Sequence, residues 1–311
     1  MHSNHFLGAV AVAWAQVGPE GNSQATLVEL VSSIKTFPTS TIISTLRQVV
    51  KSPPPVSGLT KGQSLDVSAL QFFSAYLTTS QVGQLLESWT GLKELLKDCC
   101  SLSPPSVFLA LSILHHFVMR GATSQMERKE VKEVQEMTSK LVETICGIAG
   151  SRLEAGTWLR GSKSVKTEAT DNNAAATETA ETSLVAAHAT AALTVLGKLL
   201  ATLLDIIYQS DEKEKVLPLL NIVMYNLVPY LRSHTQSNLP LLRAGSGLLA
   251  SLSEYPFTRR AWRKEGMELL LDPSFFLVDH ETLRSWRITT DSMMSHERKK
   301  TFPAQTKLAL A

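Results

Sequence analysis

The stretch VKEVQEMTSKLVETICGI, residues 131–148, spaces its apolar side chains by three and four, the period of an α-helix. These apolar positions are Val131, Val134, Met137, Leu141, Ile145 and Ile148. The opposite face carries charged side chains at Glu127, Arg128, Lys132, Glu133, Glu136 and Lys140. A helix with one apolar stripe is stable when that stripe packs against other helices. The stretch therefore predicts a helix with one buried face.

The same period recurs along most of the chain, including segments 104–118, 217–231 and 239–252. We expect Ser103 and Pro104 to begin the first of these helices and Gly121 to end it. Alternating runs bounded by Asn-Gly or Asp-Gly turns, which indicate strands, do not occur. We therefore predict an all-α fold, an irregular HEAT-like α-solenoid of about ten helices paired by short turns. A compact helical bundle is the alternative.

Two breaks divide the predicted row of helices. Residues 51–64 form a loop rich in Pro, Gly and Ser, and residues 161–181 have almost no large apolar side chain. A segment without large apolar side chains cannot bury a core, so we predict that 161–181 is a disordered loop. The expected organisation is an N-terminal helical group at 1–160, this loop, a C-terminal helical group at 182–297 and a divergent tail at 298–311.

Two apolar segments raise the question of a signal peptide or a membrane span. Residues 6–18 are apolar, but no Lys or Arg precedes them, and a signal peptide needs such a residue. Residues 184–208 are interrupted by His188, Lys198 and Asp205 and lack the roughly 20 apolar residues that a span requires. We interpret both segments as buried helices.

Composition limits the class of protein. Hydrophobic residues make up 44% of the chain and charged residues 19%, which is typical of a folded protein. The 30 basic and 28 acidic residues nearly balance at a net charge of +2, so we expect no nucleic-acid partner. Cys99, Cys100 and Cys146 have the spacing of neither a disulfide framework nor a metal site, and we expect reduced thiols.

A search for catalytic or cofactor motifs gives no candidate. Neither a Gly-rich phosphate loop nor a complete nucleophile elbow occurs, and we expect the small residues 245–247 to let two helices approach closely. His115 and His116 are adjacent, so on a helix they point about 100° apart and cannot share a metal. We expect one of them at the edge of the core and the other in solvent. The prediction is a protein without cofactor, metal or catalytic site; an unrecognised helical enzyme is the least favoured alternative.

The stretch SEYPFTRRAWRKEGMELLLDPSFF, residues 253–276, is the candidate binding site. On a helix that starts at Thr258, four cations fall within an arc of about 140° and Trp262 lies beside them, toward the core. These four cations, the basic ridge, are Arg259, Arg260, Arg263 and Lys264. The ridge is either a solvated helix face or a contact for an acidic protein surface or anionic lipid, since local Lys and Arg clusters attract such partners. Nucleic acid is the least favoured of the three.

Residues 212–276 also resemble the C-terminal region of the Dopey family of large eukaryotic trafficking proteins. The similar motifs there are VPYLRSH at 228–234, LLASLSEYPFTRRAWRKE at 248–265 and LLLDPSFF at 269–276. Farther upstream, LDVSALQFF at 65–73 and IAGSRLEAGTWLR at 148–160 are similar too. The resemblance covers most of the chain and is most specific in its C-terminal third.

The resemblance implies a non-enzymatic scaffold or adaptor in protein transport between endosomes, trans-Golgi network and Golgi. It implies a cytosolic protein, peripherally bound to those membranes. The implied partners are a Mon-type scaffold related to large Arf exchange factors and a phospholipid flippase of the type IV P-type ATPase class. The alternative is a peripheral membrane-binding module whose basic ridge contacts anionic lipid. Family members are several times longer and continue differently after residue 297, so we expect a partial or truncated chain.

Overall fold

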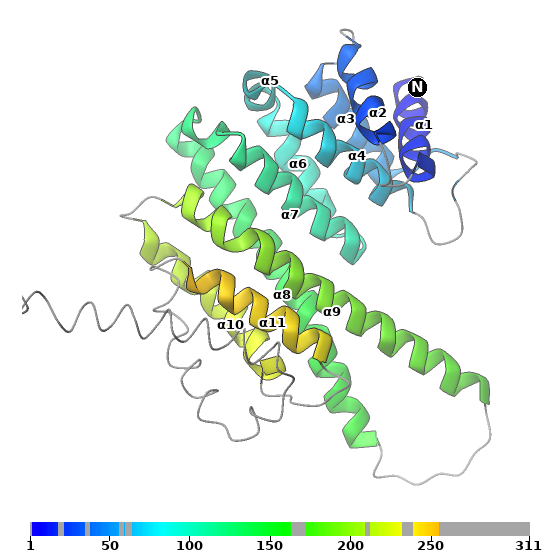
Figure 1. Ribbon diagram of the computed structural model, residues 1–311, viewed down its shortest axis with the longest axis vertical. Helices are drawn as coiled ribbons and strands as arrows, with labels where there is room; N and C mark the ends of the chain where they lie inside the picture. Colours follow the sequence, from blue (N-terminus) through cyan, green and yellow to red (C-terminus); the bar gives the residue numbers. More distant parts are fainter. Residues whose placement is uncertain are drawn as a thin grey trace, which may run out of the picture. The chain divides into compact units, whose positions relative to one another are not determined.

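The computed structural model describes residues 2–17, 22–34, 38–55, 59, 64–162, 172–208, 212–231 and 239–254 (Figure 1). Of these, the side chains of residues 2–4, 152–162, 172–182, 213, 228–231 and 239 are not described. The described ranges contain eleven α-helices, two 3-10 helices and no strand, which confirms the prediction of an all-α fold. The chain divides into two compact units. Unit 1 is Met1–Ile145 with Ile206–Tyr208, and unit 2 is Cys146–Asp205 with Gln209–Ala311.

Unit 1 contains seven complete α-helices, a short 3-10 helix and the first part of α8. Their bounds are α1 His2–Val17, α2 Ser23–Ser33, α3 Thr39–Lys51, α4 Leu65–Thr79, α5 Val82–Glu87, α6 Trp89–Cys99, α7 Pro104–Met119, η1 Ala122–Ser124 and α8 Arg128–Ser162. The amphipathic stretch 131–148 lies within α8. Its apolar positions Val134, Met137, Leu141 and Ile145 are buried, whereas Lys132, Glu136 and Lys140 are exposed. The predicted stripe is confirmed.

Helix α4 occupies the centre of unit 1, against α1 on one side and α7 on the other (Figure 1). Its Phe72 and Phe73 are completely buried, and Phe72 meets Trp14 of α1 edge to face with 5.7 Å between ring centroids. Trp89 of α6 stacks on Phe117 of α7 at 5.1 Å. Aromatic pairs at such distances contribute about 0.5–1.5 kcal/mol beyond the burial of their area. The core of unit 1 therefore forms around aromatic side chains from four helices.

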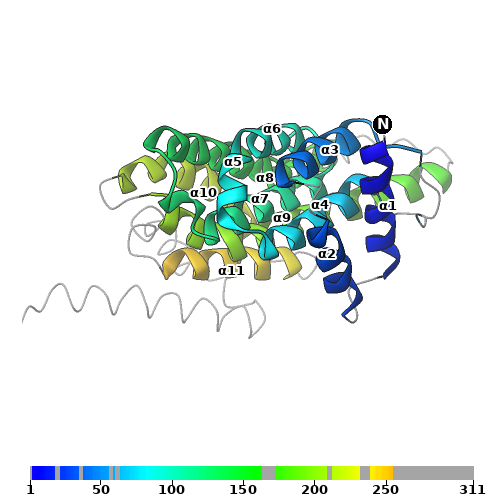
Figure 2. The ribbon, with the colours of Figure 1, turned by 90° about the horizontal axis from the view of Figure 1, so that it is seen from above.

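The helices of unit 1 pack in two layers. Helix α3 packs on α1 and α6 in one layer, and α4 packs on α2 and α7 in the other (Figure 2). Apart from the short α5, successive helices thus alternate between the layers, and each packs on the next helix of its own layer, as in HEAT-like repeats. The prediction of solenoid-like packing is confirmed for this unit.

Helix α7 begins and ends at the predicted residues. At its start, however, the Ser103 side chain makes a different contact from the capping bond that a serine at this position usually makes. Gly121 adopts a left-handed conformation with φ of 78°, which ends the helix as expected because glycine has no Cβ to clash there. Ser103 does occupy the N-cap position, and its carbonyl oxygen accepts the first helical hydrogen bonds. Its hydroxyl pairs with the Ser106 hydroxyl at 3.1 Å and makes no capping bond, so that detail of the prediction was wrong.

Unit 2 contains the rest of α8, α9 Asn172–Ile207 up to Asp205, η2 Lys213–Val216, α10 Leu217–Leu231 and α11 Leu239–Ser253. Gly150 of α8 touches Asn226 of α10, and Gly197 of α9 touches the backbone of α11. A Cβ at Gly197 would lie 3.2 Å from both Cα and N of Leu248 and 3.5 Å from the carbonyl carbon of Gly247. A close approach of helices is therefore present beside residues 245–247, but Gly197 of α9 permits it, because a Cβ at Gly247 would meet nothing within 4 Å.

The division into units differs from the organisation expected from sequence. It falls inside α8, between Ile145 and Cys146. The segment 161–181, predicted to be disordered, contains the end of α8 and the start of α9 at Asn172. Alanine at 174–176 favours helix even where no large apolar side chain is present, which composition alone does not register. For residues 163–171, which lie outside the described ranges, disorder stays a prediction.

One described helix segment, Ser183–Ile207, is long and apolar enough to cross a membrane by length and composition alone. Core helices of soluble proteins meet the same criteria. Leu193, Leu196 and Leu200 of this segment are buried, whereas Leu184 is 58% exposed. The helix thus has one buried face and one partly exposed face, so the expectation of a buried helix holds for one side alone, and the apolar run is longer than expected from the sequence.

The contact at Gly197 yields a stability prediction. Changing Gly197→Ala puts a Cβ against backbone atoms that cannot move as a side chain would, and overpacking of this kind costs about 1–3 kcal/mol. Thermal unfolding followed by circular dichroism should show a lower midpoint than for the unchanged chain.

Gly247→Ala is the matched control, because a Cβ there has nothing within 4 Å. Alanine favours helix over glycine by about 1 kcal/mol, so this variant should unfold at the same temperature or higher. If Gly197→Ala were as stable as Gly247→Ala, α9 and α11 would not be in backbone contact.

Candidate interaction surfaces

The basic ridge, Arg259, Arg260, Arg263 and Lys264, lies outside the described residues, which end at Glu254. Helix α11 ends at Ser253, the first residue of the quoted stretch, and the described residues stop one residue later. The proposed exposure of the ridge and the proposed burial of Trp262 therefore stay predictions.

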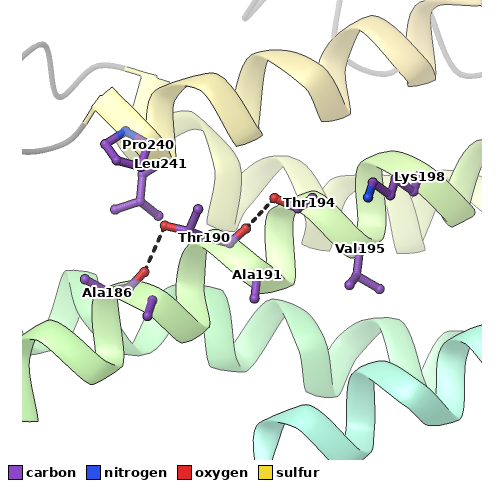
Figure 3. Close-up of a pocket in the computed structure, with 9 residues that line it drawn as sticks. Ala186, Thr190, Ala191, Thr194, Val195, Lys198, Pro240 and Leu241 are labelled. Carbon is purple, nitrogen blue, oxygen red and sulfur yellow. Dashed lines mark hydrogen bonds between the residues drawn. The ribbon is translucent and has the colours of Figure 1, made fainter. Parts of the chain in front are cut away.

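An apolar groove of about 550 Å³ lies within unit 2, between α9 and the first turn of α11 (Figure 3). Helix α11 supplies Pro240 and Leu241. Helix α9 supplies a row of mostly small side chains: Ala186, Ala187, Thr190, Ala191, Thr194, Val195 and Lys198. We call this feature the α9–α11 groove. Its volume falls in the range of roughly 300–1,000 Å³ that is typical of pockets for small organic ligands.

The groove follows from the spacing of small residues on α9. Ala187, Ala191 and Val195 follow one another at intervals of four, so they lie along one face of the helix. Small side chains leave space over that face, while Pro240 and Leu241 rise on the other side of the groove (Figure 3). The close approach at Gly197 then lies at the Lys198 end of the row.

The groove offers few polar groups. The Thr190 hydroxyl donates to the Ala186 carbonyl at 2.9 Å, and the Thr194 hydroxyl donates to the Thr190 carbonyl at 2.8 Å (Figure 3). Both hydroxyls are thus satisfied within α9, and such back-bonding leaves mainly the apolar part of each side chain to face the groove. Lys198 is the one charged residue among those that line the groove, and the side chain is exposed.

Sequence reasoning missed the α9–α11 groove because it treated residues 184–208 as a buried helix. The available signal was the run of Ala and Thr at positions 186–194, which is too small to fill the space beside a helix. That run alone cannot locate the opposite wall, since Pro240 and Leu241 lie on another helix some 50 residues later. The arrangement suits binding of an apolar body.

A second surface feature in unit 1 is an ion-pair cluster between α3 and α6. Arg47 of α3 donates from Nη2 to Glu94 at 3.1 Å and from Nε to Asp98, and Lys51 Nζ lies 3.0 Å from the same Asp98 carboxylate. A depression of about 600 Å³ beside it is lined by Ser44, Arg47, Gln48, Lys51, Ser52 and Gly91. The cations there are already paired with carboxylates, so the cluster fastens α3 to α6 and leaves little free charge for a ligand.

Burial alone would raise the pKa of the Asp98 carboxyl, whose side chain is 19% exposed. Hydrogen bonds from Arg47 and Lys51 outweigh that effect and hold the pKa below its ordinary value. Elsewhere in unit 1, Glu133 accepts from Trp89 Nε1 at 3.1 Å and from Lys93 at 3.0 Å, and these bonds lower its pKa as well. Both carboxylates are thus held in place by cations from neighbouring helices.

The histidines and cysteines of the described ranges are held in the packing of the helices. His115 and His116 are both half-buried, so the expectation that one lies in solvent was wrong; His116 Nδ1 pairs with the Ser74 hydroxyl at 3.1 Å. Burial lowers the pKa of His115. Burial also raises the pKa of Cys99 to about 12 and that of Cys100. Among the described residues, no three His, Cys, Asp or Glu side chains are grouped to hold a metal ion.

Comparison with known proteins gives one consistent result. The family described as DOP1 C-terminal matches residues 72–309. The chain is 38% identical over its full length to Protein DOP1 homolog of Drosophila melanogaster, and 37% identical to Protein DOP1B of Mus musculus over 94% of its length. Protein pad-1 of Caenorhabditis elegans is 29% identical over 69% of the chain.

The matches have two limits. The chain spans only about 13% of the length of the fly protein, 14% of the mouse protein and 12% of the nematode protein. The names of these relatives state no catalytic activity and no ligand. No solved structure matches the chain.

The Asp98 cluster predicts a pH-dependent contribution to stability. The pKa of Asp98 is lower in the folded protein than its ordinary value of 3.8, so the ionised carboxylate stabilises the fold above that value. This contribution is lost as the pH falls through the lowered pKa. Urea unfolding of the unchanged chain and of Asp98→Asn should therefore differ most near neutral pH and converge below about pH 4.

Glu136→Gln is the matched control, because it removes an exposed carboxylate from α8 for which no described residue forms an ion pair. Its stability should track that of the unchanged chain across the same pH range. A difference between Asp98→Asn and the unchanged chain that did not vary with pH would contradict the charged contact.

Proposed function

This chain belongs to the DOP1, or Dopey, family, and from that premise we propose that it is a scaffold segment in protein transport between endosomes, trans-Golgi network and Golgi. It acts by protein–protein docking and carries out no catalysis. It works in the cytosol, peripherally associated with those membranes. The observation that carries the proposal is the match to the family over the whole of this chain, together with the two-layered helical packing of unit 1, which is typical of repeat proteins that bind partners on their surface.

The charges of the described surface also support a docking role. The exposed face of α8 alternates cations with acids, and the strongest cluster, around Arg47, is internally neutralised. Such a surface exerts no long-range attraction, so partner choice rests on local features. The basic ridge places four cations within six residues, more than any other six-residue window of the sequence, and is the docking site that we propose.

The proposed partner is a Mon-type scaffold related to large Arf exchange factors, with a phospholipid flippase as a further member of the assembly. Local electrostatic attraction accelerates encounter between proteins and fixes their register more than it raises affinity. An acidic surface on the Mon-type scaffold is the chemistry that would meet the basic ridge. No cofactor or nucleic acid takes part in the proposed function.

A pull-down with the chain as bait, from cytosol and from Golgi membrane extract, tests this proposal. The bait variant changes Arg259, Arg260, Arg263 and Lys264 together to Ala. We expect the unchanged chain to recover the Mon-type scaffold. The variant should recover at least tenfold less of it, because four contact cations are removed at once.

A matched control removes four exposed cations from α8 instead: Arg128, Lys129, Lys132 and Lys140. It changes the net charge by the same amount and should recover the partner normally. Equal recovery of the partner by all three baits would contradict docking at the ridge. Failure of the unchanged chain would show that this segment does not carry the partner contact.

The alternative is a peripheral membrane-binding module, which the sequence of the basic ridge favours. Cations near an anionic leaflet each contribute about 1 kcal/mol to membrane binding, and salt weakens that attraction. In this version the ridge meets lipid headgroups directly, and the protein partner is secondary.

Sedimentation with vesicles distinguishes the two versions. If the alternative holds, the chain sediments with vesicles that contain phosphatidylserine, does so less at high salt, and stays in solution with neutral phosphatidylcholine. The ridge variant should lose binding on the order of a thousandfold, and the α8 control should not. Absence of binding to acidic vesicles at low salt would reject the alternative and leave the docking proposal intact.

A further inference from the structure

We propose that the α9–α11 groove binds a long-chain fatty acid, with the acyl chain along α9 and the carboxylate beside the Lys198 ammonium. The inference goes beyond the docking function and uses none of the residues of the basic ridge. It rests on the groove's shape, on its lack of polar groups and on the position of its one charge.

The shape of the groove suits a single extended chain. The lining residues of α9 run from Ala186 to Lys198, and twelve residues of helix extend over about 18 Å. The α9 wall of the groove is therefore elongated, and the groove's volume of about 550 Å³ is in the range of small-molecule sites.

The chemistry of the lining suits an apolar body with one acidic end. The hydroxyls of Thr190 and Thr194 are satisfied by α9 carbonyls, so neither calls for a partner from a ligand. The ammonium of Lys198 is the charged group at one end of the row, and no described residue forms an ion pair with it (Figure 3). A carboxylate complements that ammonium, whereas an apolar chain complements the Ala, Thr, Val, Pro and Leu atoms of the rest.

Leu184 supplies an independent indication of an apolar occupant. Its side chain is 58% exposed, and it precedes Ala187 by three residues, so it continues the groove's apolar face by one turn away from Lys198. An exposed leucine in line with an apolar groove extends the surface that a long chain can cover. A ligand with its charge at Lys198 would then point its chain toward Leu184.

The experiment is a fluorescence titration of the full chain with cis-parinaric acid, whose emission rises in an apolar environment. Palmitate and hexadecanol then serve as competitors, below the concentrations at which they aggregate. We expect saturable binding of one molecule per chain and displacement by palmitate. Shortening the competing acid should weaken displacement by up to about fourfold per methylene, from the transfer free energy of that group.

Three variants and two controls locate the site. Ala187→Leu and Ala191→Leu fill the groove from one helix face and should reduce binding at least tenfold, whereas Ala25→Leu, on the exposed side of α2, should not. Lys198→Gln should weaken palmitate about two- to fivefold, the typical strength of an exposed ion pair, and leave hexadecanol unchanged. Lys132→Gln is its control on α8. Circular dichroism confirms that each variant is folded.

Three results would overturn the proposal: no saturable binding by the unchanged chain, unchanged binding by both groove-filling variants, or equal loss of acid and alcohol in Lys198→Gln. The basic-ridge variant should bind palmitate like the unchanged chain. The pull-down can therefore fail while the titration succeeds, and the reverse, so the two proposals are tested separately.

Discussion

The contact between Gly197 and the backbone of Leu248 sets the geometry on which unit 2 depends. Two helices can approach to backbone distance only where neither carries a side chain between them, and Gly197 provides that position. Helix α11 is fixed beside α9 at this point. Its first turn then borders a row of alanines and threonines that are too small to fill the space. The two helices are therefore in contact at Gly197, and the α9–α11 groove lies between them near the first turn of α11.

Helical period and the local chemistry of helix ends made much of the fold predictable. The stripe from Val131 to Ile148 predicted α8 and its buried face, and Gly121 predicted the end of α7, because both depend on neighbours within a few residues. The hydroxyl of Ser103 shows the limit of such local rules, since Ser106 competes successfully for it. The α9–α11 groove could not be predicted from sequence, for a different reason. Its two walls are about 50 residues apart, and only tertiary packing brings them together.

Charge has two separate roles along this chain. Where Asp98 and Glu133 receive cations from neighbouring helices, charge fastens one helix to another within unit 1. On the outer face of α8, alternating charges are exposed to solvent. The charged face of α8 was predicted from sequence, but the pairing of Asp98 was not, because residues 47 and 98 become neighbours only through the packing of α3 on α6. The basic ridge differs from both because no acidic residue lies between Arg259 and Lys264. Its role is therefore the central functional question.

The burial of Cys99 has a consequence for oxidative chemistry. With a pKa of about 12, its thiol at neutral pH is ionised in only about one molecule in 10⁵, so peroxide finds almost no thiolate there. Its neighbour Cys100 is less buried, and its Sγ donates to the Leu96 carbonyl at 3.5 Å. Oxidation of this pair would therefore begin at Cys100. The resulting sulfenic acid would find an adjacent sulfur that is too weakly ionised to close a disulfide. Two cysteines that are contiguous in sequence thus differ in reactivity because Cys99, the last residue of α6, is buried and Cys100, just after the helix, is less so.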